Sequence, residues 1–270
     1  MQTRTFTDTH VHLDFPELAD DLKFLLEQCT LQSINRLIVP TVAPSNWQKA
    51  LALKNHGENN KPLIYCALGI HPWYLKGLSE HHLVELDNLI DETLSKPNKL
   101  VAVGEMGLDG VIAKEQGNLA QQITFFEYQL ALTNKYQLPA IVHHRRTHEQ
   151  TLVMLKQQTP DKGGIIHAFS GSYQQAVRYI DLGFKLGIGG TITYPRAKKT
   201  INAIKRLPVE CLVLETDAPS MPLNGYQGQA NSPLRIIDVF EHLAEIRSEE
   251  QEQLAHQLEQ NVSQLFGFNE

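Results

Sequence analysis

Residues 6–14 read FTDTHVHLD, a short β-strand pattern that holds two histidines two positions apart. Because side chains of a strand alternate between its two faces, His10 and His12 are expected to point to the same side. Two imidazoles on one face at the end of a strand are typical of half a divalent-metal site. The alternative is a pair of surface histidines near a chain end. Further ligands at the same place would decide between the two interpretations.

The rest of the chain alternates short apolar or β-branched runs with amphipathic segments, as a parallel sheet with crossover helices does. Strands are predicted at 5–12, 34–42, 63–70, 100–108, 139–144, 164–169, 185–191 and 211–217. Helices are predicted at 16–30, 44–57, 80–96, 118–136, 147–158, 173–183, 197–206, 233–247 and 249–266. Eight βα units in 270 residues predict an α/β fold, a single (β/α)8 TIM barrel domain over residues 1–270. A doubly wound open sheet is the alternative, but no Gly-rich dinucleotide fingerprint follows the first strand.

The composition narrows the class of protein. Cys29, Cys66 and Cys211 lie far apart, which argues against a disulfide framework and favours a reducing cytoplasm. No apolar run resembles a signal peptide or reaches the ~20 residues that cross a bilayer, so no membrane association is expected. The net charge of −6 argues against a broad basic surface that coats nucleic acid. This net charge remains compatible with an enzyme that binds only the end of a nucleic acid, within its active site. No obligate protein partner is indicated.

Active residues of a TIM barrel lie where its strands end and the following loops begin. In this chain six of the eight predicted strands end in histidine or carboxylate side chains. These residues are His10 and His12, His71, Glu105, His143, His167, and Asp217. Their shared position predicts that they meet at one end of the barrel.

The number of candidate ligands indicates more than one metal ion. His10, His12, Glu105, His143, His167 and Asp217 supply four imidazoles and two carboxylates. This is too many for one four-coordinate ion and predicts two divalent ions with Glu105 as a bridge. Mixed nitrogen and oxygen ligands suit Zn, Mn, Co or Fe, whereas Mg favours oxygen alone. The sequence does not choose among these metals.

A two-metal site predicts hydrolysis by a metal-activated water. Asp217 is the candidate for both ligation and proton transfer, and Arg145, two residues after His143, is the candidate for phosphate binding. His71 has three interpretations: substrate contact, a further metal ligand, or packing beside its neighbours. His144 is expected to point away from the barrel interior. Glu215 and Asp109 are expected to contact metal ligands or shape turns, and glycines 187–190 to allow close packing.

Six segments resemble the TatD family of metal-dependent hydrolases, in the order in which that family carries them. They are 8–14 (DTHVHLD), 69–72 (GIHP), 103–109 (VGEMGLD), 143–145 (HHR), 167–171 (HAFSG) and 214–219 (LETDAP). Segments 189–196 (GGTITYPR) and 221–229 (MPLNGYQGQ) resemble a bacterial subgroup of the family. Gly110 and Arg146 depart from the aromatic and acidic residues that are frequent in the family at these positions.

The resemblance implies a TIM barrel with two divalent metals. His10, His12 and Asp217 would hold one ion, His143 and His167 the other, and Glu105 would bridge them. Magnesium- or manganese-stimulated deoxyribonucleases of 3′ ends are among the family's members, so nucleic-acid ends or small phosphoesters are the expected substrates. Amide or ester hydrolysis on the same dinuclear site is the alternative, and a non-catalytic metal-binding protein is a remote one.

Overall fold

The computed structural model describes residues 4–56, 62–97 and 99–268. Its strands are β1 Phe6–Asp8, β2 Ile34–Pro40, β3 Leu63–Leu68, β4 Leu100–Asp109, β5 Ala140–Arg145, β6 Gly164–Ile166, β7 Phe184–Ile188 and β8 Leu212–Leu214. All eight form one sheet in the order β1 to β8, and every neighbouring pair is parallel. The predicted α/β barrel is therefore confirmed, with strands that are mostly shorter than predicted.

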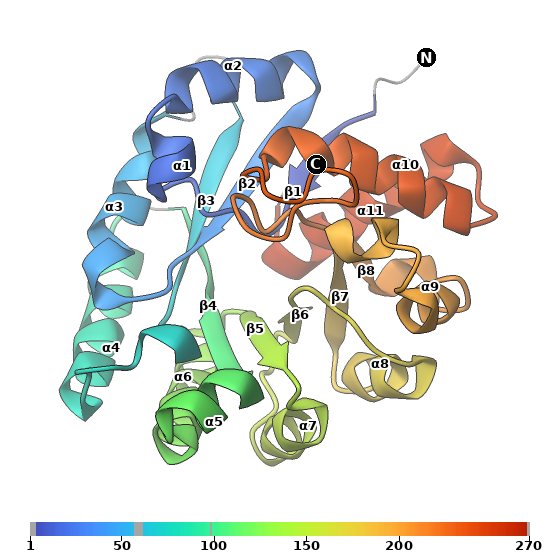
Figure 1. Cartoon of the computed structure of the whole chain (residues 1–270). Helices are drawn as coiled ribbons and strands as arrows, with labels where there is room; N and C mark the ends of the chain where they lie inside the picture. Colours follow the sequence, from blue (N-terminus) through green and yellow to red (C-terminus); the bar gives the residue numbers. More distant parts are fainter. Residues whose placement is uncertain (1–3, 57–61, 98, 269–270) are drawn as a thin grey trace.

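Helices surround this ring of strands on the outside (Figure 1). The α-helices are α1 Pro16–Ala19, α2 Leu22–Leu31, α3 Trp47–Ala52, α4 Glu80–Leu94, α5 Gly110–Gln116, α6 Leu119–Tyr136, α7 His148–Gln157, α8 Tyr173–Ile180, α9 Lys198–Ile204, α10 Ile236–Ile246 and α11 Gln251–Phe266. Short 3₁₀ turns are η1 Pro44–Asn46, η2 Leu53–His56, η3 Pro72–Tyr74, η4 Gly190–Thr193, η5 Val209–Cys211 and η6 Pro233–Arg235. No helix in the described ranges is both long and apolar enough to cross a membrane.

The barrel closes where the segment after β1 meets the segment after β8. The Asp217 N–H donates to the His10 carbonyl at 2.9 Å, and the His12 N–H donates to the Ala218 carbonyl at 2.8 Å. These two hydrogen bonds run in opposite directions between the two segments, whose junction is here called the seam. Two segments that carry candidate ligands are thereby placed side by side.

The first strand ends earlier than predicted. β1 stops at Asp8, and Val11 forms only an isolated bridge to Ala218. The Asp8 carboxylate accepts the His10 N–H at 3.1 Å, which removes that donor from the strand ladder. Strict strand alternation is therefore the wrong description of residues 10–12, although the His10 and His12 rings still lie together, with centroids 5.0 Å apart.

Helix α5 was not predicted, and three predicted helices are divided, of which 233–247 appears as η6 and α10. The Asp109 carboxylate caps α5 by accepting the N–H groups of Val111 and Ile112 at 2.8 and 3.0 Å. The predicted helix 16–30 appears as α1 and α2. The predicted helix 44–57 appears as η1, α3 and η2, and its last residue, 57, lies outside the described ranges.

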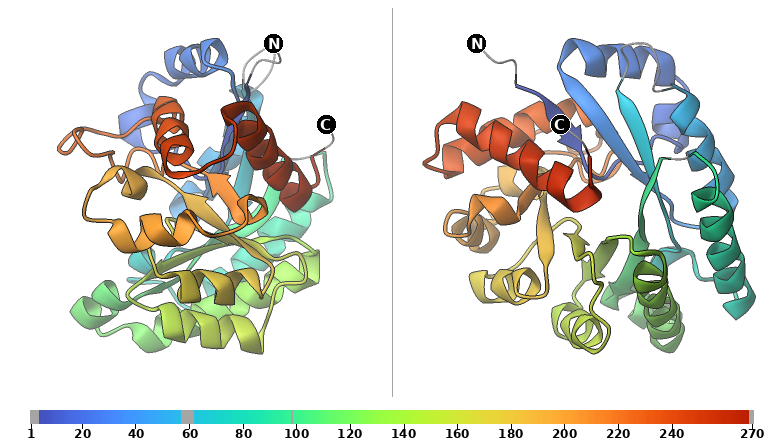
Figure 2. Two further views of the ribbon diagram at one scale, coloured as in Figure 1. Left: turned by 90° about the vertical axis from the view of Figure 1, so that its right-hand side faces the viewer. Right: turned by 180° about the vertical axis from the view of Figure 1, so that it is seen from behind.

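The end of the barrel at which the strands begin is covered by α11, as the view from behind shows (Figure 2). Glu259 of this helix accepts hydrogen bonds from Thr7 at 2.8 Å and Arg36 at 3.0 Å. Asn261 donates to the carbonyls of Val209 and Leu212. Helix α11 therefore covers this end, and the candidate ligands lie at the opposite end, where the strands finish.

Candidate metal centre

The six predicted ligands converge at the end of the barrel where the strands finish. Glu105 of β4 lies at the centre of one half of the cluster. Its Oε2 is 3.0 Å from His10 Nε2, and its Oε1 is 3.2 Å from His143 Nδ1. A third imidazole, that of His71, places its Nε2 3.3 Å from Oε1. Glu105 is thus the residue that contacts ligands from several strands, as a bridging carboxylate would.

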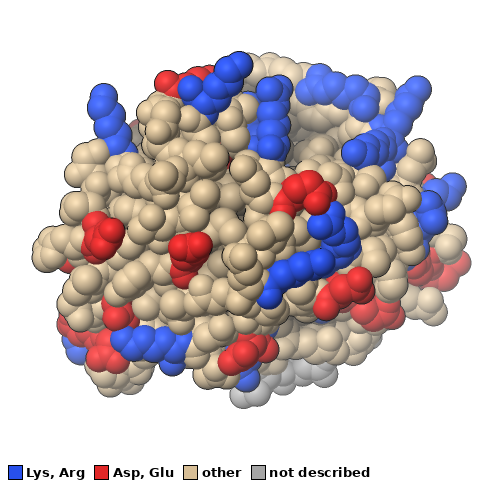
Figure 3. All heavy atoms as spheres, turned by 90° about the horizontal axis from the view of Figure 1, so that it is seen from below, with Lys and Arg blue, Asp and Glu red and all other residues tan. Residues whose placement is uncertain are grey.

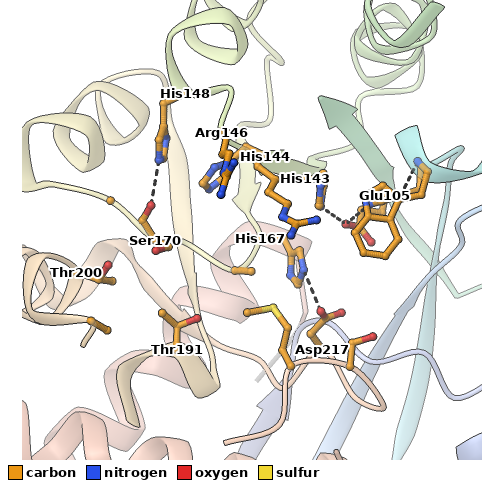
Figure 4. Close-up of a pocket in the computed structure, with 18 of the residues that line it drawn as sticks. Glu105, His143, His144, Arg146, His148, His167, Ser170, Thr191, Thr200 and Asp217 are labelled. Atoms are coloured by element: carbon orange, nitrogen blue, oxygen red, sulfur yellow. Dashed lines mark hydrogen bonds and ion pairs between the residues drawn. The ribbon is translucent and has the colours of Figure 1, made fainter. Parts of the chain in front are cut away.

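Asp217 organises the other half of the cluster. Its Oδ1 lies 3.4 Å from His12 Nε2, and its Oδ2 lies 3.7 Å from His167 Nε2. Burial alone would raise the pKa of Asp217, but the neighbouring His167 and His12 imidazoles outweigh it and hold the pKa well below its ordinary value. Figure 4 shows Glu105, His143, His167 and Asp217 along one side of the cavity.

The chemistry of the cluster fits divalent cations. Glu105 is only 3% exposed, and buried charges are costly unless they are paired or bind a metal. In the described part of the chain, His10 Nδ1 has no hydrogen-bond partner, and His10 Nε2 faces the Glu105 carboxylate. Three groups could each hold an ion: His10 with His167 and Asp217, His10 with His12 and Glu105, and His71 with Glu105 and His143. Imidazole nitrogens and carboxylate oxygens in this mixture suit transition metals.

His71 contacts Glu105 directly. Its Nδ1 accepts the Trp73 N–H at 3.1 Å, so in the neutral ring the proton is on Nε2, which faces Glu105. Burial lowers the pKa of His71 to about 4, and the neutral form therefore prevails at pH 7. In this tautomer His71 is a donor to the Glu105 carboxylate. The interpretation that His71 only packs beside Trp73 is therefore insufficient.

Two further carboxylates lie behind the histidines. Asp109 Oδ2 is 3.2 Å from His143 Nε2 and accepts the Trp73 indole N–H at 2.6 Å. Glu215 Oε1 is 3.1 Å from His167 Nδ1 and accepts the Ala168 N–H at 2.6 Å. Carboxylates in such positions orient a metal-binding imidazole and raise its basicity. The expectation that Asp109 and Glu215 contact ligands is met.

A comparison with protein families gives one match over nearly the whole chain. The model described as TatD related DNase matches residues 7–267. The chain belongs to the TatD-related DNase family. Among curated TatD-type relatives, the chain is 43% identical to the uncharacterized metal-dependent hydrolase YjjV of Escherichia coli K12, over 97% of each chain. It is 37% identical to an uncharacterized metal-dependent hydrolase of Haemophilus influenzae, over 97% of this chain and 99% of that one.

Solved structures give the same relationship. The crystal structure of YjjV, a TatD homologue, superposes with a TM-score of 0.91 at 42% identity, and the match covers 100% of both chains. The fold of the TatD family is therefore the fold described above. The segments that carried the resemblance in the sequence are the segments that supply the clustered side chains.

The glycine of β7 makes room for one of the supporting carboxylates in this TatD-family chain. A Cβ added at Gly187 would lie 2.1 Å from Glu215 Oε2, whereas one at Gly189 would lie 3.3 Å or more from its nearest neighbour. Close packing at glycines 187–190 is confirmed here.

We expect Gly187→Ala to push Glu215 away from His167. Overpacking of this kind costs about 1–3 kcal/mol, so the melting temperature and the retained metal should both fall. Gly189→Ala is the matched control and should lower the melting temperature and the retained metal less than Gly187→Ala does. Thermal melting with metal analysis checks this, and equal effects from the two variants would refute it.

Six of the clustered side chains line a cavity of about 850 Å³: His12, His71, Glu105, His143, His167 and Asp217. Four cationic side chains line it, from Arg145, Arg146, Arg196 and Lys199. In the view from below, Lys and Arg side chains gather along the upper edge of the molecule (Figure 3). Cations at the mouth of a cleft in a protein of net charge −6 favour an anionic ligand.

Sequence reasoning set His144 aside because it was expected to point away from the barrel interior. The side chain does point away from His143, but the cavity extends past β5 and His144 lines it. His148, the first residue of α7, lines the same region. No local sequence signal identifies them, because the extent of the cavity depends on how α7 and α8 pack outside the strands.

Proposed function

We propose that the protein is a divalent-metal-dependent hydrolase that cleaves phosphodiester bonds, with nucleic-acid ends as its preferred substrates. One observation carries this proposal: a buried cluster of imidazoles and carboxylates lies in a cavity that cationic side chains line. The cluster is suited to activating water, and the cations are suited to a phosphate. We place the activity in the cytoplasm, since all three cysteines are unpaired.

In this proposal two divalent ions, of Zn, Mn, Mg, Co or Fe, would be held by His10, His12, Glu105, His143, His167 and Asp217. Bound there, they would supply positive charge to the phosphate and a water of lowered pKa. Asp217, which is deprotonated at neutral pH, takes up the proton of the attacking water. Glu105 bridges the two halves of the site, and His71 holds its Oε1.

Arg145 and the aromatic residues of η3 are suited to the substrate. The Arg145 guanidinium lies 6.0 Å from the Trp73 ring and can present two parallel N–H groups to a phosphate. Trp73 and Tyr74 are 45% and 40% exposed at the cavity. Exposed aromatic faces beside a phosphate site offer stacking to unpaired bases.

Amide or ester hydrolysis is the competing function for the same cluster. The cations of the cavity favour an anionic substrate over a neutral acyl compound. This observation is the reason to prefer phosphodiesters.

The experiment compares substrates on protein that has been stripped of metal and reloaded with Mn, Zn, Mg, Co or Fe. We expect hydrolysis of a 3′-hydroxyl single-stranded oligonucleotide and of bis(4-nitrophenyl) phosphate, and none in excess chelator. RNA of the same sequence is the third substrate, and acylated amines and esters form the comparison panel. Turnover of acyl compounds without phosphodiesters would establish the competing function, and no turnover on any substrate would contradict both.

A further inference from the structure

Five side chains on one side of the metal centre form a closed ring of contacts, here called the support ring. Glu105 Oε1 lies 3.2 Å from His143 Nδ1 and 3.3 Å from His71 Nε2. The Trp73 N–H donates to His71 Nδ1 at 3.1 Å. The Trp73 indole N–H donates to Asp109 Oδ2 at 2.6 Å, and the same oxygen lies 3.2 Å from His143 Nε2. The direction of the imidazoles therefore depends on where His71 and Asp109 are held.

Pairing between β3 and β4 does not hold these two residues. Among the described residues, the last registered pair of the two strands is Leu68 with Val103, and both His71 and Asp109 lie beyond it. Helix α6 packs against β4 on the outside of the barrel (Figure 1). At this place side chains of α6 supply backbone hydrogen bonds that a neighbouring strand would otherwise supply.

Gln129 of α6 holds the residue that precedes His71. Its Oε1 accepts the Ile70 N–H at 2.7 Å, and its Nε2 donates to the Ile70 carbonyl at 3.1 Å. The same Nε2 donates to the Phe125 carbonyl at 3.0 Å, one turn earlier in the helix. Gln129 is fully buried, and its amide is satisfied by these contacts. Both backbone groups of Ile70 are thereby fixed, and with them the start of the His71 residue.

Gln122 forms the same pattern with Asp109. Its Oε1 accepts the Asp109 N–H at 2.8 Å, and its Nε2 donates to the Asp109 carbonyl at 3.2 Å. The second proton of the amide goes to Asn118 Oδ1 at 2.9 Å, again one turn earlier. Gln122 is also fully buried. Because Gln122 and Gln129 are about two helical turns apart, one face of α6 binds the backbone on both sides of the support ring.

We propose that Gln122 and Gln129 are positioning residues for the metal centre. Gln122 acts through Asp109, and Gln129 acts through His71, so one helix aligns the support ring from two sides. Neither glutamine lines the cavity, and we therefore expect an effect on metal affinity without a direct effect on substrate contacts. The inference rests on the metal centre of the proposed function and does not depend on which bond is cleaved.

The first test measures metal affinity. Gln122→Met and Gln129→Met keep an unbranched side chain of good helix propensity but remove the amide. We expect the affinity of metal-free protein for Mn²⁺, measured by calorimetry, to fall about 10-fold in each variant. Gln121→Met is the matched control, because Gln121 of the same helix donates to the carbonyls of Leu75 and Leu78, outside the support ring. The control should lower the melting temperature and leave the Mn²⁺ affinity unchanged.

The second test uses the two tryptophans of the chain and needs neither metal nor turnover. In ¹⁵N-labelled protein the indole N–H resonance of Trp73 reports its hydrogen bond to Asp109. We expect this resonance to shift in Gln122→Met and to stay in place in Gln121→Met. The indole of Trp47, which donates to a backbone carbonyl, gives the reference resonance, and Trp73→Phe assigns the two signals.

Double-mutant cycles test the route of each effect. If Gln122 acts through Asp109, adding Gln122→Met to Asp109→Asn should weaken Mn²⁺ binding little further. The same is expected when Gln129→Met is added to His71→Ala. Fully additive losses would show that the glutamines do not act through these residues.

Two milder variants decide the case in which a methionine variant does not fold. Asn118→Ala removes one acceptor of the Gln122 amide, and Gln129→Glu keeps the oxygen that accepts the Ile70 N–H. We expect both to weaken Mn²⁺ binding in the same direction. Unchanged affinity in both would contradict the proposal.

The outcomes separate a positioning role from a structural one and from the proposed function. Weaker Mn²⁺ binding in the two methionine variants, with wild-type affinity in the Gln121→Met control, supports the proposal. Wild-type affinity in all three variants despite lower melting temperatures would overturn it. If wild-type protein binds Mn²⁺ but hydrolyses no phosphodiester, only the proposed function fails. If wild-type protein binds no divalent metal, both fail.

Discussion

Glu105→Gln is expected to lower kcat/KM for phosphodiester hydrolysis by about 10³-fold or more and to reduce the bound metal. The reason is the position of this carboxylate among four imidazoles from three segments of the chain. The atoms of His10, His143, His71 and His12 lie 3.0, 3.2, 3.3 and 3.8 Å from its oxygens. Glutamine preserves the shape but removes the charge that these contacts surround, so both halves of the site lose their common partner.

The measurement pairs steady-state kinetics with metal analysis of the same samples. Glu127→Gln is the control. Glu127 is an exposed residue of α6 outside the cavity, so this substitution removes the same charge without touching the cluster. It should match wild type in both measurements. Wild-type metal content and turnover in Glu105→Gln would show that the bridging role assigned to this residue is mistaken.

Asp217→Asn is expected to lower kcat by about 10²–10⁴-fold while more of the metal is retained than in Glu105→Gln. Asparagine keeps one oxygen that can face a cation but cannot accept the proton of the attacking water. The backbone supports this comparison, because Asp217 has a φ of +57°, and asparagine tolerates the left-handed region well. The folded structure should therefore persist.

Single-turnover kinetics at saturating metal separates the two roles of Asp217. Asp91→Asn, on the exposed side of α4, is the control for the change of charge. A variant whose activity returns to the wild-type level when metal is added would show that Asp217 acts only as a ligand. A large loss of kcat that added metal does not restore is the expected result.

The sequence was sufficient for the barrel and for the position of the cluster. Strand and helix periodicity repeated eight times, and parallel strands must all end on the same side of a barrel. Residues as distant in sequence as His10, Glu105 and Asp217 could therefore be placed together without knowledge of any contact. The positions of Asp109 and Glu215 near the cluster also followed from this geometry.

Other features depend on contacts that local patterns do not contain. The Asp8 carboxylate ends β1 by accepting an N–H, and the Asp109 carboxylate starts α5 in the same way, so each boundary depends on one side chain. Which carboxylate supports which histidine depends on the register between strands. The orientation of His144 was predicted correctly, yet its access to the cavity follows from the packing of helices outside the sheet.

The seam between the segments after β1 and β8 brings together ligands from the first and last strands, so the site requires both ends of the barrel sequence. The Thr216 hydroxyl and N–H donate to the carboxylate of Asp8, 208 positions away, beside ligands on both strands. During synthesis, a partial chain that lacks β8 can pair β1 only with β2 and has no Asp217, so it cannot complete the cluster. We expect that opening of this seam under stress would separate His10 and His12 from Asp217 while the rest of the barrel stays folded. Loss of turnover should therefore precede loss of helical signal, and activity then reports whether the first and last strands are joined.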